Sequence, residues 1–371
     1  MTVISSFSIN NCPILLGDLL VSGDENLQLS LSIPTIGEIT KVFPKGSGFV
    51  PTGLTQKIAI MNDNLALAWA GSRISAKIII GNLLKEAQKK SNWNFDDLSY
   101  FFADYDKEYG DDINFIGYSN DGERIFSFGY GTNQIKYNSE NYGLVRLCGS
   151  GAINLRSSLN HFDNLSASRT TNPLESAVAN TLVITTYMTG KERITCRNLS
   201  EYYGGGFEIL SFVRRKFKKI DDITYLVWIG RQLRDLSWEL SPPEICIKYY
   251  YLDDMLLIKR AEFKTQKRGT LTCDNEAVHI VTPIYRNAND VVLENINLSS
   301  FNSIFLCSFI ILYCIDGSIE ILNRINYSGD RSHLIKFIDN NKDILQIDIN
   351  SNYIKSIFDS VMATNKMQQR K

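Results

Sequence analysis

The chain has 371 residues, an ordinary globular composition and a formal net charge of −1. The near-neutral charge excludes the strong positive field that attracts nucleic acids, and no apolar run is long enough to predict a membrane span. Seven cysteines without a C-x-x-C pair and three scattered histidines predict reduced thiols, no metal site and no other cofactor. With no basic and apolar leader at the N-terminus, we expect a cytoplasmic protein.

Two apolar, β-favouring runs open the chain at residues 2–9 and 13–22, and Asn10-Asn11 separates them. This pattern predicts a hairpin. Residues 24–56 follow with three prolines and four glycines. Such punctuation predicts a long loop or insertion, which is either functional or a tolerated surface feature.

The following segments alternate between strands and pairs of helices. Strands are predicted at 57–60, 65–70, 112–119, 124–129, 142–147, 207–213 and 223–229. Helices are predicted after a cap at Ser72 and at 96–105, 154–161 and 173–189. This order is that of an α+β, four-layer αββα sandwich, in which two antiparallel sheets face each other between layers of helices.

The pattern changes after about residue 231, and Pro242-Pro243 marks a boundary. Short strand-like runs follow, with helical periodicity only at about 334–361. We therefore expect two domains, the sandwich at residues 1–231 and a smaller β-rich domain at residues 232–371. The basic run at 214–219 is expected to be a solvated hairpin tip rather than a nucleic-acid site.

Thr2 is small enough for methionine aminopeptidase to remove Met1 and leave Thr2 as the first residue. An N-terminal threonine carries a nucleophile and a base in one residue, because its own α-amine can accept the hydroxyl proton. That amine has an ordinary pKa of about 7.7–8.0, so part of it is neutral near pH 7. The alternative is that Thr2 is an ordinary strand residue.

Residues 2–230 resemble the proteasome β-subunit family, the threonine branch of the N-terminal nucleophile hydrolases. Thr2 stands at the position of the family's catalytic threonine, and Asp18 follows at the family's interval of sixteen residues. Lys57 begins a strand, turn and strand that end in Ala70-Gly71, so that Gly71 follows Lys57 at the family's interval of fourteen residues. The remaining matches are two glycine motifs, Gly149-Ser150-Gly151 and Gly204-Gly205-Gly206.

The resemblance implies a threonine hydrolase that cleaves peptide or other amide bonds. Thr2 would supply the nucleophile and the base, and Lys57 would stabilise the alkoxide and keep the amine neutral. Asp18 would hold Lys57, Ser150 would bind the amine and relay a proton, and the Gly71 N–H would bind the oxyanion. The alternatives are that Asp18 merely ends a strand, Lys57 is a solvated charge and Ser150 caps a helix.

The resemblance also implies a substrate cleft and an assembly. Ser22 and Gly71 would flank the cleft and pair with an extended peptide, and Trp69 would narrow or occlude the side-chain pocket unless it is a plain core aromatic. The family's homo-oligomers stack as rings, so the resemblance implies a homo-oligomer that acts on peptide or protein substrates.

 The sequence identifies no particular ATPase partner for such an assembly.

Three features depart from the family pattern. The 24–56 insertion lies between Asp18 and Lys57, and residues 198–203 lack the family's Asp and Ser, for which Ser200 or Glu201 would have to substitute. The additional C-terminal domain would add an interface or prevent stacking. The altered segment at 198–203, together with obstruction of the cleft by Trp69 and the 24–56 insertion, would support the alternative of a catalytically inactive subunit that acts as a scaffold or binding module.

Overall fold

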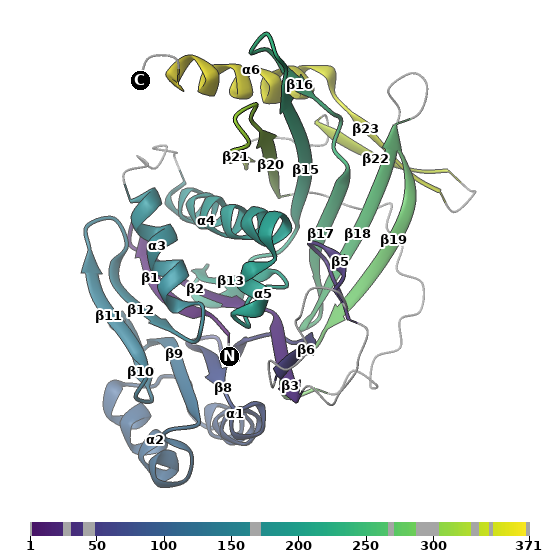
Figure 1. Cartoon of the computed structure of the whole chain (residues 1–371). Coiled ribbons are helices and arrows are strands. Elements are labelled where there is room, and N and C mark those ends of the chain that lie inside the picture. The colour runs from purple at the N-terminus through teal and green to yellow at the C-terminus, as the bar shows by residue number, and fades with distance from the viewer. Residues whose placement is uncertain are drawn as a thin grey trace.

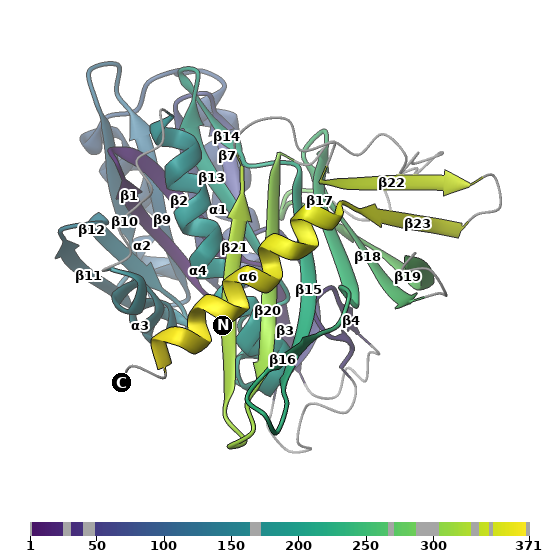
Figure 2. The same cartoon turned by 90° about the horizontal axis from the view of Figure 1, so that it is seen from above.

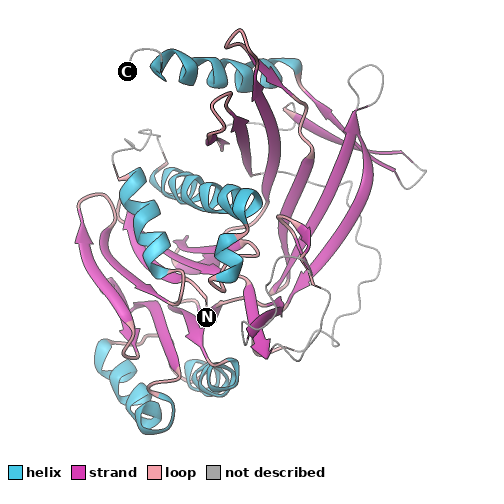
Figure 3. Cartoon of the chain, in the orientation of Figure 1, coloured by secondary structure: helices cyan, strands magenta, loops and turns pink. Residues whose placement is uncertain are grey.

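The computed structural model describes residues 2–24, 31–39, 49–163, 172–265, 271–286, 304–327, 334–340 and 344–368. Strands make up 47% and helices 27% of these residues. Figure 3 shows that the strands gather in three main sheets, with the helices on their outer faces or between them. The described part of the chain is therefore a strand-dominated, mixed α/β protein.

The first sheet contains six strands in the order β11-β12-β1-β2-β13-β14. Their bounds are Ile4–Ile9 (β1), Cys12–Asp18 (β2), Gln134–Ser139 (β11), Gly143–Cys148 (β12), Phe207–Val213 (β13) and Lys216–Lys219 (β14). Strands β1 and β2 form the predicted N-terminal hairpin, in which Asn10 and Asn11 adopt the positive φ angles that asparagine tolerates in a tight turn. The β13–β14 pair confirms the hairpin predicted at the basic run.

The second sheet contains four strands in the order β10-β9-β8-β7. Their bounds are Ile58–Asn62 (β7), Leu65–Gly71 (β8), Ile113–Asn120 (β9) and Ile125–Tyr130 (β10). Alternate side chains of β8 face opposite sides, as a strand requires. Trp69 packs under helices α1 (Arg73–Ala87) and α2 (Phe95–Tyr109), whereas Ala68 faces the first sheet. Ser72 caps α1, as predicted.

Helices α3 (Ala152–Phe162) and α4 (Pro173–Thr195) cover the face of the first sheet that points away from the second sheet. The short α5 (Arg197–Ser200) follows α4 and packs through Leu199 against Leu20 and Ile33. Helix α4 is buried on two sides, because Leu182 and its neighbours share one apolar cluster with Phe7 of β1 and Phe309 of β20. Figure 1 shows α4 between the first sheet and a third, larger sheet. This helix therefore joins the two halves of the molecule.

The third sheet contains nine strands in the order β21-β20-β15-β17-β18-β19-β23-β22, with β16 paired to β15. Their bounds are Ile223–Gln232 (β15), Trp238–Leu240 (β16), Ile245–Leu252 (β17), Met255–Thr265 (β18), Leu271–Val281 (β19), Phe305–Tyr313 (β20), Ile319–Asn326 (β21), Ile335–Asn340 (β22) and Ile344–Ile349 (β23). Every pairing in it is antiparallel except that of β15 with β20.

Helix α6 (Ser351–Gln368) crosses the outer side of the third sheet, as Figure 2 shows, and packs on it through Tyr353, Ile357 and Val361. Helical periodicity was predicted from about residue 334, and that prediction is wrong for Ile335–Asn340 and Ile344–Ile349, which form β22 and β23. Among the described residues, no helix is both long enough and apolar enough to cross a membrane.

The predicted 24–56 insertion contains regular structure. Strand β6 (Phe49–Leu54) pairs with β3 (Leu20–Asp24), and the short strands β4 (Ser32–Ile33) and β5 (Gly37–Glu38) pair with each other. The rest of the insertion, at 25–30 and 40–48, lies outside the described residues.

The predicted α+β fold, a four-layer αββα sandwich followed by a smaller β-rich domain, is wrong. The largest sheet is the mostly antiparallel, nine-stranded half-barrel, and α4 is buried between this sheet and the first one. Burial along both faces of β15 allows this strand to occupy a central place, but the sequence does not specify its partners. The predicted boundary near residue 231 falls inside β15, and the two-domain division stays a prediction.

Candidate active site

Thr2 lies two residues before the start of β1 and is fully buried. Its hydroxyl donates a hydrogen bond to Asp18 Oδ1, and its main-chain nitrogen donates to Ser150 Oγ over 3.3 Å. Its carbonyl accepts a hydrogen bond of 3.1 Å from the N–H of Gly151. The structure thus brings together three of the predicted site residues, from the N-terminus, the end of β2 and the start of α3.

The glycines around Ser150 allow this close approach. Gly149 has a φ of +95°, and a Cβ added there would lie 2.1 Å from the Thr2 carbonyl oxygen. A Cβ at Gly151 would meet the ring of Tyr203 at 2.6 Å. The alternative that Ser150 caps α3 is wrong, because the N-cap of that helix is Gly151 and makes no side-chain capping bond.

Asp18 is the last residue of β2 and its carboxylate is completely buried. Besides the Thr2 hydroxyl, it accepts the N–H of Val3 at 3.1 Å and the N–H of Gly204 at 2.9 Å. Burial raises the pKa of Asp18, while the charge of Lys57 and these hydrogen bonds oppose the rise. Asp18 therefore does more than end a strand, since it ties the N-terminus to the glycine loop at 204–206.

Lys57 directly precedes β7 and is 2% exposed, so the alternative of a solvated surface charge is wrong. Its Nζ lies 4.2 Å from the centroid of the Trp69 ring, which is a cation–π contact. Among the described residues, no ion pair joins Lys57 to Asp18. Burial lowers the pKa of Lys57 to about 8, against the charges of Asp18 and Glu208 and together with that of Arg73.

Trp69 is 1% exposed and belongs to the core under α1 and α2, as its structural alternative predicted. Its indole N–H donates to the carbonyl of Gln56 over 3.2 Å. Its ring also forms the surface against which the Lys57 ammonium rests. Trp69 therefore contributes to both the core and the surroundings of Lys57, and its role in substrate selection stays a prediction.

The two residues predicted to flank a cleft lie on different elements. Gly71 ends β8, is exposed and has a φ of +117°, and a Cβ there would meet the Asp112 carbonyl at 2.2 Å. Ser22 lies in β3 opposite Pro51 of β6, so one edge of β3 is already paired. No hydrogen bond among the described residues joins Gly71 or Ser22 to Thr2, and their binding roles stay predictions.

Sequence reasoning missed a second buried carboxylate beside the site. Glu192 in α4 is 1% exposed and accepts hydrogen bonds from the N–H of Gly205 at 3.0 Å, the hydroxyl of Thr35 and the amide of Asn198. Burial raises its pKa, and the charge of Asp18 raises it further. The available signal was a charged residue among the otherwise uncharged buried residues of a long helix.

The glycine loop therefore bridges two carboxylates, since Gly204 donates to Asp18 and Gly205 donates to Glu192. Ser200 and Glu201, the substitutes considered for the family's Asp and Ser, have other partners. Ser200 bonds the carbonyl of Arg197, and Glu201 pairs with the Arg197 side chain at 3.1 Å. Glu192, and neither Ser200 nor Glu201, therefore accepts the hydrogen bond from the glycine loop.

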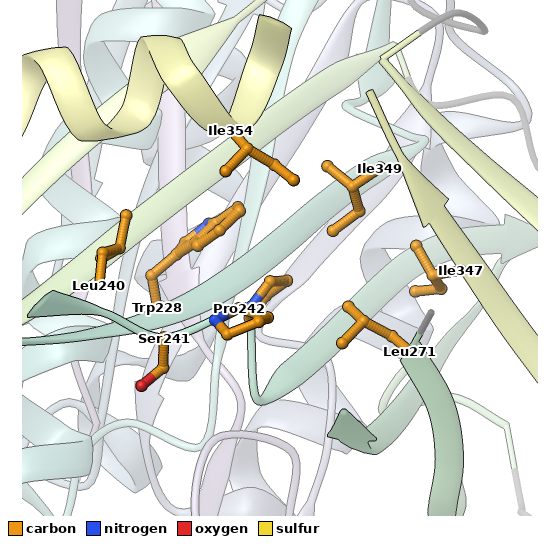
Figure 4. Close-up of a pocket in the computed structure, with 9 residues that line it drawn as sticks. Trp228, Leu240, Ser241, Pro242, Leu271, Ile347, Ile349 and Ile354 are labelled. Carbon is orange, nitrogen blue, oxygen red and sulfur yellow. The ribbon is translucent and has the colours of Figure 1, made fainter. Parts of the chain in front are cut away.

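Two hollows in the surface belong to other parts of the molecule. A cavity of about 160 Å³ lies in the apolar cluster under α6 and is lined by Trp228, Pro242, Ile347 and Ile354, as Figure 4 shows. A groove of about 540 Å³ lies between α4 and β21, beside Tyr187. Neither is lined by the residues around Thr2.

Among the described residues, no cluster of three metal-ligating side chains occurs, and all seven cysteines are unpaired.

Comparison with known proteins adds no assignment, because no protein-family model and no curated protein matches the chain. The functional argument therefore depends on the geometry around Thr2 and on the spacing of the sequence motifs.

Proposed function

We propose that the protein is an N-terminal threonine hydrolase that cleaves peptide or other amide bonds, related to the proteasome β-subunits, and active once Thr2 is the first residue. One observation carries the proposal. Both polar groups of Thr2 that the reaction would use have side-chain partners, because the hydroxyl bonds the buried Asp18 and the main-chain nitrogen bonds Ser150. An ordinary strand residue requires neither partner.

In the proposed reaction, Thr2 Oγ attacks the carbonyl carbon of the amide, and the hydroxyl proton passes to the neutral α-amine of Thr2. The oxyanion is stabilised by the charge of Lys57 and the N–H of Gly71. The C–N bond then breaks, the departing amine takes the proton from the α-ammonium, and an ester remains on Thr2. Water cleaves the ester, releases the acid and restores the hydroxyl.

The electrostatics around Thr2 support these roles. Lys57 is a buried cation with a pKa of about 8, and a positive charge near the Thr2 amine favours its neutral, basic form. Asp18 accepts the hydroxyl hydrogen and so orients Oγ. Ser150 Oγ lies 3.3 Å from the nitrogen and 3.4 Å from the carbonyl oxygen of Thr2, a position suited to guiding a proton.

The same chemistry makes the proposed enzyme dependent on processing. While Met1 is attached, the Thr2 nitrogen belongs to a peptide bond, and an amide nitrogen is not a useful base. We therefore expect a chain that retains Met1 to be inactive, whatever the arrangement of Asp18, Lys57 and Ser150.

A peptide epoxyketone provides a direct test, because a hydroxyl can add to its ketone and an adjacent amine can open its epoxide. Protein released from a cleavable fusion so that it begins at Thr2 should gain the mass of the probe. Thr2→Ser should still react, whereas Thr2→Ala and protein that retains Met1 should not. A folded protein that begins at Thr2 but neither reacts with such probes nor cleaves a peptide library would contradict the proposal.

The second candidate function is a catalytically inactive subunit that serves as a scaffold or binding module, in a homo-oligomer or a ring. It is favoured by the complete burial of Thr2 and by the contact of the Lys57 ammonium with Trp69. It predicts that trimming to Thr2 leaves the protein unreactive, while size-exclusion chromatography with light scattering detects a stable assembly of both Thr2→Ala and wild-type protein.

A further inference from the structure

A second carboxylate acts on Lys57, and it comes from outside the motifs of the sequence. Glu208 is the second residue of β13, and its side chain is completely buried. It lies opposite Gly17 of β2, the neighbour of Asp18. A Cβ added at Gly17 would lie only 2.9 Å from the Cβ of Lys57, so the Lys57 side chain passes directly over this glycine.

The carboxylate of Glu208 has a full set of partners. Its Oε1 accepts the N–H of Ile58 at 2.6 Å, and this N–H belongs to the residue directly after Lys57. Its Oε2 accepts hydrogen bonds from Lys219 Nζ at 2.8 Å and from the Tyr251 hydroxyl at 3.3 Å. Glu208 therefore fixes the backbone on one side of Lys57.

Gln56 fixes the backbone on the other side of Lys57. Its main-chain N–H donates to the carbonyl of Thr282 over 3.1 Å. Its side-chain amide donates to the main-chain carbonyls of Asp254 at 2.8 Å and Val281 at 2.6 Å. Its side-chain oxygen accepts a hydrogen bond from Lys219. All three carbonyls lie at one end of the third sheet, next to the β17–β18 turn and the end of β19.

The charges along this path alternate in sign. Lys219 contacts Glu208, and the charges of Glu208 and Asp18 both act on Lys57. Arg73 at the start of α1 is the remaining charged group that acts on Lys57, and it has the opposite effect. In a buried setting such charges interact strongly, because little water screens them.

We propose that Glu208 is a positioning residue that keeps Lys57 charged and holds the backbone at its position, and that the end of the third sheet serves as its support. Only the effect of this positioning on catalysis rests on the proposed function. The electrostatic part concerns the folded protein alone and holds for an inactive subunit as well. It gives the C-terminal sheet a role in the candidate site through Tyr251, Asp254 and Val281.

The test measures the titration of Lys57 by NMR, from the ¹³Cε shift in lysine-labelled protein, with Lys57→Arg to assign the signal. Glu208→Gln keeps the shape of the side chain but removes its charge, and should lower the midpoint from about 8 by roughly one pH unit. Tyr251→Phe is the matched control, since it removes a hydrogen bond to Glu208 without removing a charge, and should leave the midpoint unchanged.

Lys219→Gln should shift the Lys57 midpoint in the opposite direction, and it provides a test even if Glu208→Gln does not fold. Without the ammonium of Lys219, the negative charge of Glu208 acts on Lys57 unopposed, so the midpoint should rise. An unchanged midpoint in either folded variant would overturn the proposal.

The pH profile of peptide cleavage separates this inference from the proposed function. In protein that begins at Thr2, loss of the Lys57 proton should set the upper limb of the profile. That limb should move to lower pH in Glu208→Gln and to higher pH in Lys219→Gln. Midpoints that shift as expected in a protein that never cleaves would support the positioning role and refute the hydrolase. Active variants whose limbs do not move would refute the positioning role alone.

Discussion

Gly149→Ala should damage both the stability and the activity of the protein, because this glycine touches the residue proposed to react. The new Cβ would start 2.1 Å from the Thr2 carbonyl oxygen and 2.7 Å from its carbonyl carbon. A Cβ essentially never approaches a neighbour more closely than 3.0 Å, so the backbone of Thr2 and that of Gly149 must separate by about 1 Å.

Two costs add to the destabilisation. A positive φ costs a residue with a Cβ about 1–2 kcal/mol, and overpacking a tight site costs about 1–3 kcal/mol more. We therefore expect a loss of about 2–5 kcal/mol, a large part of a typical unfolding free energy of about 5–15 kcal/mol. A displacement of about 1 Å at a reacting group also lowers a rate by about 10²-fold, since Thr2 would leave its bonds to Ser150 and Gly151.

Urea unfolding followed by tryptophan fluorescence measures the first effect, and peptide cleavage by protein that begins at Thr2 measures the second. Gly81→Ala in α1 is the matched control, because a Cβ there meets no atom within 4 Å. That change should be neutral or should stabilise the helix by about 0.5–1 kcal/mol. A Gly149→Ala protein with the wild-type urea midpoint would refute the steric argument. A midpoint lowered as expected, with undiminished cleavage per folded molecule, would refute the link to Thr2.

Two further variants test the buried charges. Glu192→Ala should lower the free energy of unfolding in urea by about 2–5 kcal/mol, because it leaves the Gly205 N–H and the Thr35 hydroxyl without their partner. Glu192→Gln should cost much less, because its side-chain amide can bond both groups. Equal losses in the two variants would contradict this account. Lys57 has a pKa of about 8 in the folded protein against an ordinary 10.5. Between these two pH values the unfolded chain therefore binds more protons than the folded protein, so the contribution of Lys57 to the free energy of unfolding should rise with pH. Relative to Lys57→Met, wild type should gain up to about 3 kcal/mol between pH 8 and 10.5, and parallel stability curves for the two proteins would show that Lys57 is not perturbed.

Local sequence features predicted the parts of the candidate site that are held by short-range chemistry. The hairpin at Asn10-Asn11, the cap at Ser72 and the glycines around Ser150 each have a residue type that one backbone geometry requires. Asp18 was expected to hold Lys57, but the structure joins it to the Thr2 hydroxyl by a hydrogen bond, and no ion pair with Lys57 occurs among the described residues. The catalytic roles of these residues stay predictions.

The remaining parts depend on contacts between distant segments. The apolar run of β15 indicates a strand buried on both faces, but it does not indicate that β20, some 80 residues later, becomes its parallel neighbour. The supports of the site were missed for the same reason. Glu192 and Glu208 are buried acidic residues whose partners at Gly205, Ile58 and Lys219 come from other elements.

The parallel pairing of β15 with β20 has a consequence for the order in which the protein is made. Nine residue pairs, from Ile223 with Phe305 to Arg231 with Tyr313, form only after the second strand has left the ribosome. Until then α4, which carries Glu192, lacks the surface formed by β20 and β21, and such distant pairing is slow. Every residue that touches Thr2 is therefore synthesised long before the structure that supports it is complete, so the nascent chain should acquire its reactive geometry late, after most of its length has been translated.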